Sequence, residues 1–195
     1  MASRLGRTHV TRRVLFFMMV SANGFYERAR WEIDWHTTDA EFNDFAIAQL
    51  DSADTLLFGR VTYEGMASYW PTPAAVADDP EVARRMNALR KIVFSRTLDR
   101  ADWNNTRIVH GDVAETIGEL KGEPGKDMIL MGSGDLAVAL ADRDLIDEYR
   151  LMVAPVALGH GKPVLDGLAH DLRLRLVDVR RFANGNVLLS YRSGG

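Results

Sequence analysis

Cysteine is absent from the 195-residue sequence, and only five histidines are present. Without cysteine the chain has no disulfides and no thiolate zinc site, which also excludes the cysteine-ligated zinc centre of nucleobase deaminases. The histidines show no spacing typical of metal ligands, such as H-E-x-x-H. We therefore expect no protein metal site.

Long apolar runs and a strong excess of one charge are also missing. No stretch approaches the roughly 20 apolar residues of a membrane-spanning helix. The chain has 24 basic and 27 acidic residues, and the resulting net charge of −3 gives no general attraction to nucleic acid or an anionic membrane. We expect neither partner, and cytoplasmic residence follows as the default.

The chain is 47% hydrophobic and long enough for one well-filled domain, but short for two. We predict a flexible basic tail at residues 1–11 and a single domain at residues 12–195. Buried strands are expected at residues 13–20, 54–58, 91–94, 107–110, 128–131 and 146–153, with helices between several of them. These features predict an α/β fold whose central sheet is mostly parallel and has flanking helices.

The C-terminal part of the chain has a different pattern. Leu172, Leu174 and Leu176 alternate with arginines, and Asn184-Gly185 is typical of a hairpin turn into a last strand at residues 187–191. The edge of the sheet is therefore expected to be an antiparallel hairpin.

Two further expectations concern the first half of the chain. They are a capping box over residues 38–41 and a long loop at residues 67–79.

The most informative stretch is residues 127–140, where an apolar strand runs through Gly132-Ser133-Gly134 into a helix. Glycines allow a sharp turn and a close approach to a ligand, and the free N–H groups of the helix start favour a phosphate. A Rossmann dinucleotide fold would have an acidic residue about 20 positions later. That region is Val153-Ala154-Pro155-Val156, so we reject the Rossmann fold and keep the phosphate site.

Four polar clusters follow expected strands, at residues 21–24, 59–62, 95–97 and 132–135. Ligands of open α/β sheets lie beyond the carboxyl ends of the strands, where helix N-termini also point. Arg60 with Thr62, and Arg96 with Ser95, combine a guanidinium with a hydroxyl, which suits the binding of phosphate. Several such clusters would be used by an adenine dinucleotide with an extra ribose phosphate.

The motifs also resemble a known family. Residues 57–64 (LFGRVTYE), residues 92–97 (IVFSRT) and Gly132-Ser133-Gly134 resemble the dihydrofolate reductase-like superfamily. Residues 145–151 (LIDEYRL) with residues 154–162 (APVALGHGK) are similar to the reductase, C-terminal domain of bacterial riboflavin biosynthesis enzymes and its stand-alone relatives. The resemblance runs from about residue 12 to residue 192, and the order of the motifs makes it specific.

This resemblance implies an NADPH-binding domain and, as is common in the family, a homodimer. Carried onto matching positions, Ser95 and Arg96 would lie at the adenosine end and favour NADPH over NADH. Ser21 and Asn23 would border the nicotinamide and the substrate. The remaining implied cofactor contacts are Gly59, Arg60 and Thr62 at the phosphates, and Gly132, Ser133, Gly134 and Asp135 along the pyrophosphate.

Hydride transfer also needs a proton source, for which Glu41 and Asp44 on the first expected helix are candidates. Asn23 stands where common relatives have aspartate, and an amide cannot exchange a proton as a carboxyl group does. The first hypothesis is an NADPH-dependent reductase of a small heterocyclic substrate, resembling 5-amino-6-(5-phosphoribosylamino)uracil reductase of riboflavin biosynthesis. The alternatives are a dihydrofolate reductase-like enzyme acting on a pterin or another acceptor, a non-catalytic nucleotide-binding dimer module, and a protein that keeps the fold without a ligand.

Overall fold

Strand β1 (Val14–Ser21) is apolar at every position but the last, and all of its residues are buried. A strand without polar alternation must be covered on both faces, as in the centre of a parallel sheet. The computed structural model, which describes residues 11–28 and 32–194, shows this arrangement. β1 pairs in parallel with β6 (Asp127–Met131) on one side and with β7 (Glu148–Ala154) on the other. The tail predicted at residues 1–11 lies, apart from Thr11, outside the described residues.

The central sheet has eight strands in the order β5-β4-β3-β6-β1-β7-β10-β9. The six strands from β5 to β7 are parallel, while β10 and β9 form the antiparallel edge, so the predicted sheet is confirmed. The strands not yet bounded are β3 (Ala53–Gly59), β4 (Arg90–Phe94), β5 (Thr106–Val109), β9 (Leu174–Arg181) and β10 (Val187–Ser193). A separate two-stranded sheet pairs β2 (Phe25–Glu27) with β8 (Lys162–Pro163).

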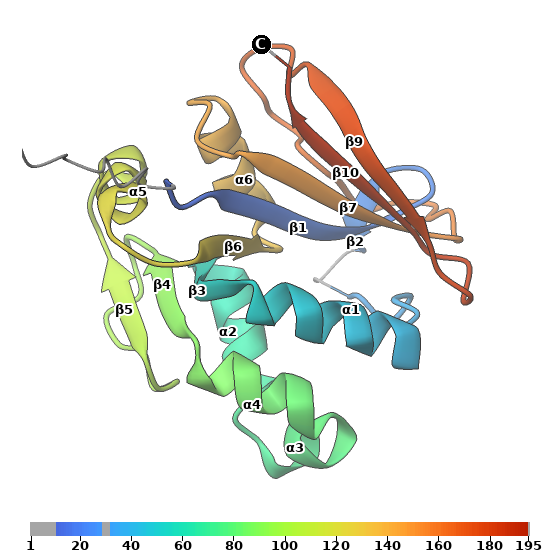
Figure 1. The fold of residues 1–195 in the computed structure, drawn as a ribbon, viewed down its shortest axis with the longest axis horizontal. Helices are drawn as coiled ribbons and strands as arrows, with labels where there is room; N and C mark the ends of the chain where they lie inside the picture. The colour runs from blue at the N-terminus through green and yellow to red at the C-terminus, as the bar shows by residue number, and fades with distance from the viewer. Residues whose placement is uncertain (1–10, 29–31, 195) are drawn as a thin grey trace, which may run out of the picture.

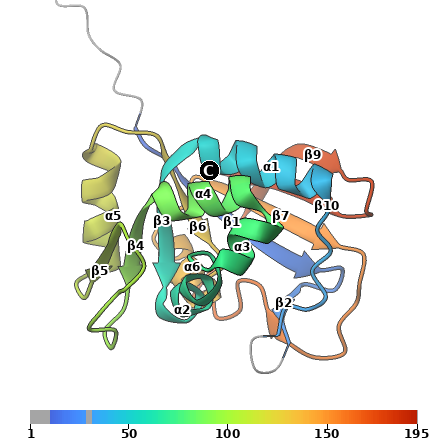
Figure 2. The ribbon, with the colours of Figure 1, turned by 90° about the horizontal axis from the view of Figure 1, so that it is seen from below.

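Helices cover both faces of the sheet (Figure 1). One face carries α1 (Ala40–Asp51), α2 (Arg60–Tyr69), α3 (Pro73–Asp78) and α4 (Pro80–Ala88), and the other carries α5 (Val113–Gly122) and α6 (Gly134–Ala141). Seen from below, α4 lies between α1 and α3 (Figure 2). Alternate residues of β1 supply the two cores: Phe16 packs toward α5 and α6, and Phe17 packs toward α1. The two halves of the chain therefore share one sheet.

Two local predictions were wrong. Residues 67–79 are not a long loop: α2 continues to Tyr69, and α3 follows because Thr72 accepts a hydrogen bond from the Ala75 backbone N–H and Pro73 occupies the first turn. The N-cap of α1 is Asp39 rather than Thr38, since the Asp39 carboxylate accepts from the Phe42 backbone N–H at 2.9 Å. The predicted hairpin is confirmed, with Gly185 at a φ of 91°.

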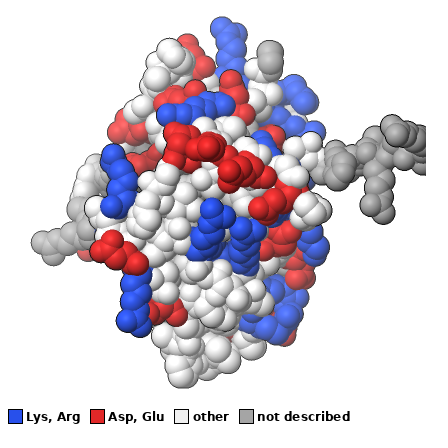
Figure 3. Space-filling view, turned by 90° about the vertical axis from the view of Figure 1, so that its left-hand side faces the viewer, with Lys and Arg blue, Asp and Glu red and all other residues white. Residues whose placement is uncertain are grey.

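The surface beside α5 and β5 carries basic and acidic side chains next to one another (Figure 3). No broad field of one sign develops on this face, in keeping with the small net charge of the chain. Among the described residues, no helix combines the length and apolar character needed to cross a membrane.

Candidate functional site

The carboxyl ends of β3, β4, β5 and β6 meet at one edge of the sheet because these strands are parallel neighbours. A cleft of about 530 Å³ opens there. Eight of the ten predicted cofactor residues line it: Gly59, Arg60, Thr62, Ser95, Arg96, Ser133, Gly134 and Asp135. Ser21 and Gly132 are not among the lining residues. The sheet thus brings three of the four polar clusters into one site.

Hydrogen bonds join the loop after β6 to the start of α2. The Ser133 hydroxyl oxygen accepts from the Gly59 backbone N–H at 2.9 Å, and the Ser133 N–H donates to the Thr62 hydroxyl at 3.0 Å. Gly132 has a φ of 60°, and a Cβ atom there would lie 3.0 Å from the Thr62 methyl carbon. Because Gly132 has no side chain, the Thr62 side chain can lie this close to its backbone.

Two helices reach the cleft without a side-chain cap. The N-termini of α1, α3, α4 and α5 are each capped by a side chain, from Asp39, Thr72, Asp79 and Asp112 respectively. By contrast, α2 and α6 begin after Gly59 and Ser133, and neither N-cap side chain bonds a first-turn N–H. Unpaired N–H groups and the helix dipole attract an anion. Both uncapped N-termini line the cleft, and so does the N-terminus of α5, which Asp112 caps.

Arginines add positive charge beside these helix ends. Arg60 is half-exposed and pairs with Glu64 on the same helix at 2.8 Å. Arg96 is exposed and, within residues 11–28 and 32–194, forms no ion pair. The Ser95 hydroxyl oxygen accepts from the backbone N–H groups of Thr97 and Leu98, so its own O–H remains free to donate. This end of the cleft can therefore offer donors to a phosphate.

The opposite wall comes from β2 and β8. Lys162 spans the cleft edge to Asp135, with 2.5 Å between Nζ and Oδ1. Burial lowers the pKa of Lys162, but the hydrogen bonds with Asp135 and with neighbouring Tyr26 outweigh burial and raise the pKa above its ordinary value. Burial also raises the pKa of the Tyr26 phenol and of the Glu27 carboxyl group. The Tyr26 ring lies so close to Gly134 that a Cβ atom there would be 2.7 Å from the phenol oxygen.

Sequence reasoning missed several lining residues. Tyr26, Glu27, His110, Asp112 and Lys162 line the cleft, but none of them was predicted to contact the cofactor. The one available signal was the cap pattern at Asp112, which marks a helix start that could have been added to the other strand ends. Tyr26 and Glu27 lie on a three-residue strand that has no recognisable pattern.

Comparison with known proteins identifies the family of the chain. Residues 12–188 match the RibD C-terminal domain family. The chain belongs to this family. It is 32% identical over 186 residues to the uncharacterised protein YyaP of Bacillus subtilis (strain 168), covering 94% of this chain and 96% of YyaP.

Solved structures share the fold. A protein assigned to riboflavin biosynthesis from Shewanella sp. PV-4 superposes with a TM-score of 0.72 at 20% identity, covering 94% of this chain and 99% of that one. The diaminohydroxyphosphoribosylaminopyrimidine deaminase/5-amino-6-(5-phosphoribosylamino)uracil reductase of Thermotoga maritima gives 0.68 at 15% identity, covering 94% and 57%. Dihydrofolate reductase of Enterococcus faecalis, complexed with NADP(H), gives 0.61 at 14% identity, covering 94% and 97%. The dihydrofolate reductase-like fold predicted for the chain is confirmed.

In this member of the RibD C-terminal domain family, Ser21 and Asn23 hold two loops together. The Asn23 amide donates to the Leu158 carbonyl at 2.8 Å and accepts from the Leu158 N–H at 3.0 Å. The Ser21 hydroxyl donates to the Asn23 side-chain oxygen at 2.9 Å and accepts from the Phe25 N–H. These contacts fix the chain between β1 and β2, which leads directly to Tyr26 and Glu27 in the cleft.

The other two catalytic candidates lie on α1, outside the cleft lining. Glu41 accepts from the Ala183 backbone N–H at 2.9 Å and pairs with Arg180 at 3.2 Å, which ties α1 to the β9–β10 hairpin. The Ala183 hydrogen bond, followed by the contact with Arg180, lowers the pKa of Glu41. Asp44 is exposed. Catalytic roles for Glu41, Asp44 and Asn23 stay predictions.

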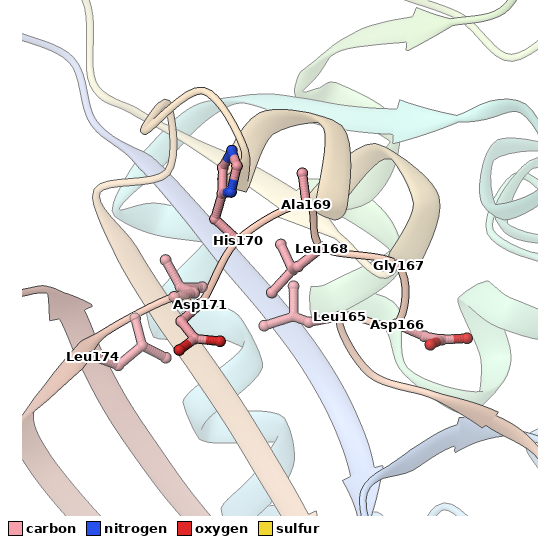
Figure 4. Close-up of a pocket in the computed structure, with 9 residues that line it drawn as sticks. Leu165, Asp166, Gly167, Leu168, Ala169, His170, Asp171 and Leu174 are labelled. Atoms are coloured by element: carbon pink, nitrogen blue, oxygen red, sulfur yellow. The ribbon is translucent and has the colours of Figure 1, made fainter.

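A second cleft, of about 470 Å³, lies along residues 165–174 (Figure 4). Leu165 and Leu168 lie at its centre, and the carboxylates of Asp166 and Asp171 lie on opposite sides of these leucines. A ligand site normally combines apolar lining with convergent polar groups. This cleft lacks that convergence among its lining residues, so the cleft at the strand ends is the better candidate.

Proposed function

We propose that the chain is an NADPH-dependent reductase of a small heterocyclic substrate. The observation that carries the proposal is the convergence of two uncapped helix N-termini, α2 and α6, with Arg60 and Arg96 in one cleft. That combination suits a ligand with several phosphate groups. Membership in the RibD C-terminal domain family supports the same reading.

The residues present fit the cofactor in chemistry as well as in position. The first-turn N–H groups of α2 and α6 would hold the pyrophosphate, and the Tyr26 ring, packed against Gly134, would limit water beside it. Ser95 and Arg96 would hold the additional ribose phosphate. When bound, the nicotinamide supplies the hydride. The protein's part is to orient the two reactants and to keep a proton available.

Lys162 would help the start of α6 to bind an anion. Its ammonium group balances the Asp135 carboxylate, which lies in the first turn of α6 and would otherwise repel a phosphate. The ion pair thus keeps the helix start receptive to anions despite the acidic residue beside it. A free ammonium proton on Lys162 could also donate to the ligand, because the group has three N–H donors.

For the substrate we propose 5-amino-6-(5-phosphoribosylamino)uracil or a related pyrimidine. The support is the family and the names carried by the similar proteins of Shewanella sp. PV-4 and Thermotoga maritima. Proton supply by Glu41 or Asp44, or through Asn23, belongs to the same proposal. Glu27 joins these candidates because its carboxyl group lines the cleft and burial raises its pKa.

We further propose that the protein forms a homodimer. Leu176 and Val179 on the edge strand β9 are 48% and 49% exposed, which is unusual for large apolar side chains in a sheet. Light scattering after size exclusion should give twice the chain mass of 21.8 kDa. A mass of one chain at micromolar concentration would contradict the dimer and leave the cofactor site untouched.

The test of the reductase proposal has two stages. Thermal unfolding with increasing NADPH and, separately, NADH should show a clear stabilisation by NADPH and little by NADH, because a ligand that binds only the folded state raises its stability. NADPH oxidation is then followed with pyrimidine, pterin and flavin acceptors. Turnover of the pyrimidine supports the proposed substrate, turnover of a pterin alone favours the dihydrofolate reductase-like alternative, and binding without any turnover favours the non-catalytic module. No stabilisation by either dinucleotide would refute the cofactor site.

A further inference from the structure

Tyr26 is the middle residue of β2 and lines the cleft. Its phenol oxygen would be 2.7 Å from a Cβ atom at Gly134, the first residue of α6, so the ring lies directly on the start of this helix. The preceding residue, Phe25, packs instead into the small core around Trp35, because neighbouring side chains of a strand alternate. The Tyr26 hydroxyl is therefore held where the cleft meets the start of α6.

The sheet order separates Tyr26 from Ser95 and Arg96. These two residues follow β4, whereas Tyr26 follows β1 and lies against the helix that follows β6. Since β3 lies between β4 and β6, the separation is two strand spacings, or about 10 Å. A dinucleotide whose ribose phosphate lies at Ser95 and Arg96, and whose pyrophosphate lies at the starts of α2 and α6, would extend its reactive end toward Tyr26.

Lys162 reaches Tyr26 from β8, whose pairing with β2 places Lys162 opposite Glu27. Gly161 permits this pairing, because a Cβ atom there would overlap the Glu27 carbonyl oxygen. The Lys162 ammonium group lies 5.9 Å from the centroid of the Tyr26 ring, hydrogen-bonds to its phenol, and lies 2.5 Å from the Asp135 carboxylate. An ammonium group only donates, so the phenol oxygen accepts and its own proton stays free to be donated.

The charges around the phenol suit a proton donor. Burial raises the pKa of Tyr26, and the hydrogen bond with Lys162 offsets part of this effect. The phenol therefore keeps its proton near pH 7, while a phenolate would have an ammonium group beside it. The nearby carboxylates of Glu27 and Asp135 also raise the pKa of the phenol. The other charged or titratable side chains that line the cleft are Arg60, Arg96, His110 and Asp112.

We propose that Tyr26 is the proton donor of the reductase and that Lys162 is the residue that positions it. The inference rests on the proposed function of the cleft and names the group that completes the reduction. As the carbon of a C=N or C=O bond takes the hydride, its nitrogen or oxygen takes the phenol proton, so the Tyr26 O–H bond breaks and a new N–H or O–H bond forms. Lys162 stabilises the phenolate and returns a proton to it, and water then restores the ammonium group.

The carboxyl candidates differ from Tyr26 in their position. Glu41 and Asp44 lie on α1, outside the cleft lining. Asn23 uses both ends of its amide to hold the loop before β8. Glu27 lines the cleft and is the competing donor. Tyr26→Phe and Glu27→Gln each remove one acidic proton while keeping the shape of the side chain, so the two variants separate these candidates.

The first measurement needs no ligand. Tyrosine is replaced by 3-fluorotyrosine throughout the chain, because fluorine lowers the pKa of a phenol and brings its titration closer to neutral pH. Fluorine NMR then follows the five tyrosines, and the signal missing from Tyr26→Phe is that of Tyr26. Lys162→Met should raise the pKa of the Tyr26 phenol by about one pH unit, because it removes a neighbouring positive charge. The control Lys126→Met should leave it unchanged, and an unchanged pKa in Lys162→Met would overturn the role of Lys162.

The second measurement compares NADPH dissociation constants with turnover of 5-amino-6-(5-phosphoribosylamino)uracil, or of a pterin if the wild-type protein reduces only that. Tyr26→Phe should bind NADPH as wild type does and lose about 100-fold to 10,000-fold in kcat. Lys162→Met should lose about tenfold in kcat, which matches a change of about one in the pKa of the donor, and Lys162→Arg should restore most of it. The matched control is Tyr69→Phe, whose phenol donates to Asp78 outside the cleft lining and which should behave as wild type.

The outcomes separate the inference from the function on which it rests. An unchanged kcat in Tyr26→Phe would overturn the inference, as would a loss confined to NADPH affinity. Loss of turnover in Glu27→Gln with none in Tyr26→Phe would assign the proton to Glu27 instead. If the wild-type protein oxidises NADPH with neither acceptor, the proposed function itself fails, and the inference fails with it. Unfolding curves of the free variants establish that each is folded.

Discussion

Replacing Arg96 by alanine is expected to weaken NADPH binding by about 10-fold to 100-fold and to leave NADH binding nearly unchanged. Arg96 is exposed and forms no ion pair with the residues that the structure describes. Its guanidinium is therefore free to bind the ribose phosphate without first breaking a contact. For the same reason, the unliganded variant should unfold at the same temperature as wild type.

The magnitude follows from the kind of contact that is lost. A hydrogen bond to a charged group contributes about 1.5–3 kcal/mol, and about 1.4 kcal/mol corresponds to a tenfold change in affinity. At an NADPH concentration of about 100 times the wild-type dissociation constant, the ligand stabilises the fold by about 2.7 kcal/mol. A variant that binds about 30-fold more weakly would gain only about 0.9 kcal/mol at the same concentration. For a chain of this size, these gains correspond to about 8 °C and about 3 °C in Tm.

The assay is a thermal unfolding series with each dinucleotide, supported by titration calorimetry for the dissociation constants. Arg100→Ala is the matched control, because Arg100 lies a few residues further along the same segment, pairs with Asp102 and is absent from the cleft lining. The control should bind both dinucleotides as wild type does. Equal losses for NADPH and NADH in Arg96→Ala, or unchanged NADPH binding, would refute the assignment of Arg96 to the ribose phosphate.

Three other perturbations follow from the structure. Lys91→Met should lower the free energy of unfolding by about 3 kcal/mol, since the buried Nζ donates to three backbone carbonyls and lies over the Trp103 ring. Denaturant titration measures this loss, and the control Lys126→Met, at an exposed position, should show a much smaller one. Burial lowers the pKa of His36 to about 4. The neutral ring therefore contributes fully to the free energy of unfolding above about pH 6.5, and this contribution, at most about 3 kcal/mol, is lost as the pH falls toward 4. Stability measured from pH 7 to pH 4 should therefore fall less steeply in His36→Leu than in wild type, and parallel curves would contradict this. Gly134→Ala should lower both Tm and NADPH affinity because its Cβ would displace the Tyr26 ring; if adding Tyr26→Ala does not restore stability, the ring is not the cause.

The central sheet could be predicted because its strands carry their own signal. Residues 14–20 and 128–131 are continuous apolar runs, and such runs are stable only where both faces of a strand are covered. The turn at Gly185 and the cap at Asp112 were likewise readable, since each depends on residues only a few positions apart. The errors were also local: Asp39 competes with Thr38 for one cap, and Pro73 starts a short helix inside an apparent loop.

The cleft was predictable only in part. The glycines, hydroxyls and arginines after the strands could be recognised because residue type and position suffice to mark a phosphate loop. The sequence could not predict that Tyr26, Glu27 and Lys162 form the opposite wall of the cleft, because β2 and β8 are too short to have a pattern of their own. The hydrogen-bond partners of Asn23 and Glu41 could not be predicted either.

The sequence by itself determined the α/β class, the parallel centre of the sheet and the residues that follow each strand, because these depend on local polarity and backbone preference. The tertiary structure alone decided which of those residues meet. It left the N-termini of α2 and α6 uncapped at one cleft, joined Asn23 to Leu158, and tied Glu41 to Ala183 on the far hairpin. The last two pairings join positions more than 100 residues apart, and all three are set by the order and register of the strands rather than by any local pattern.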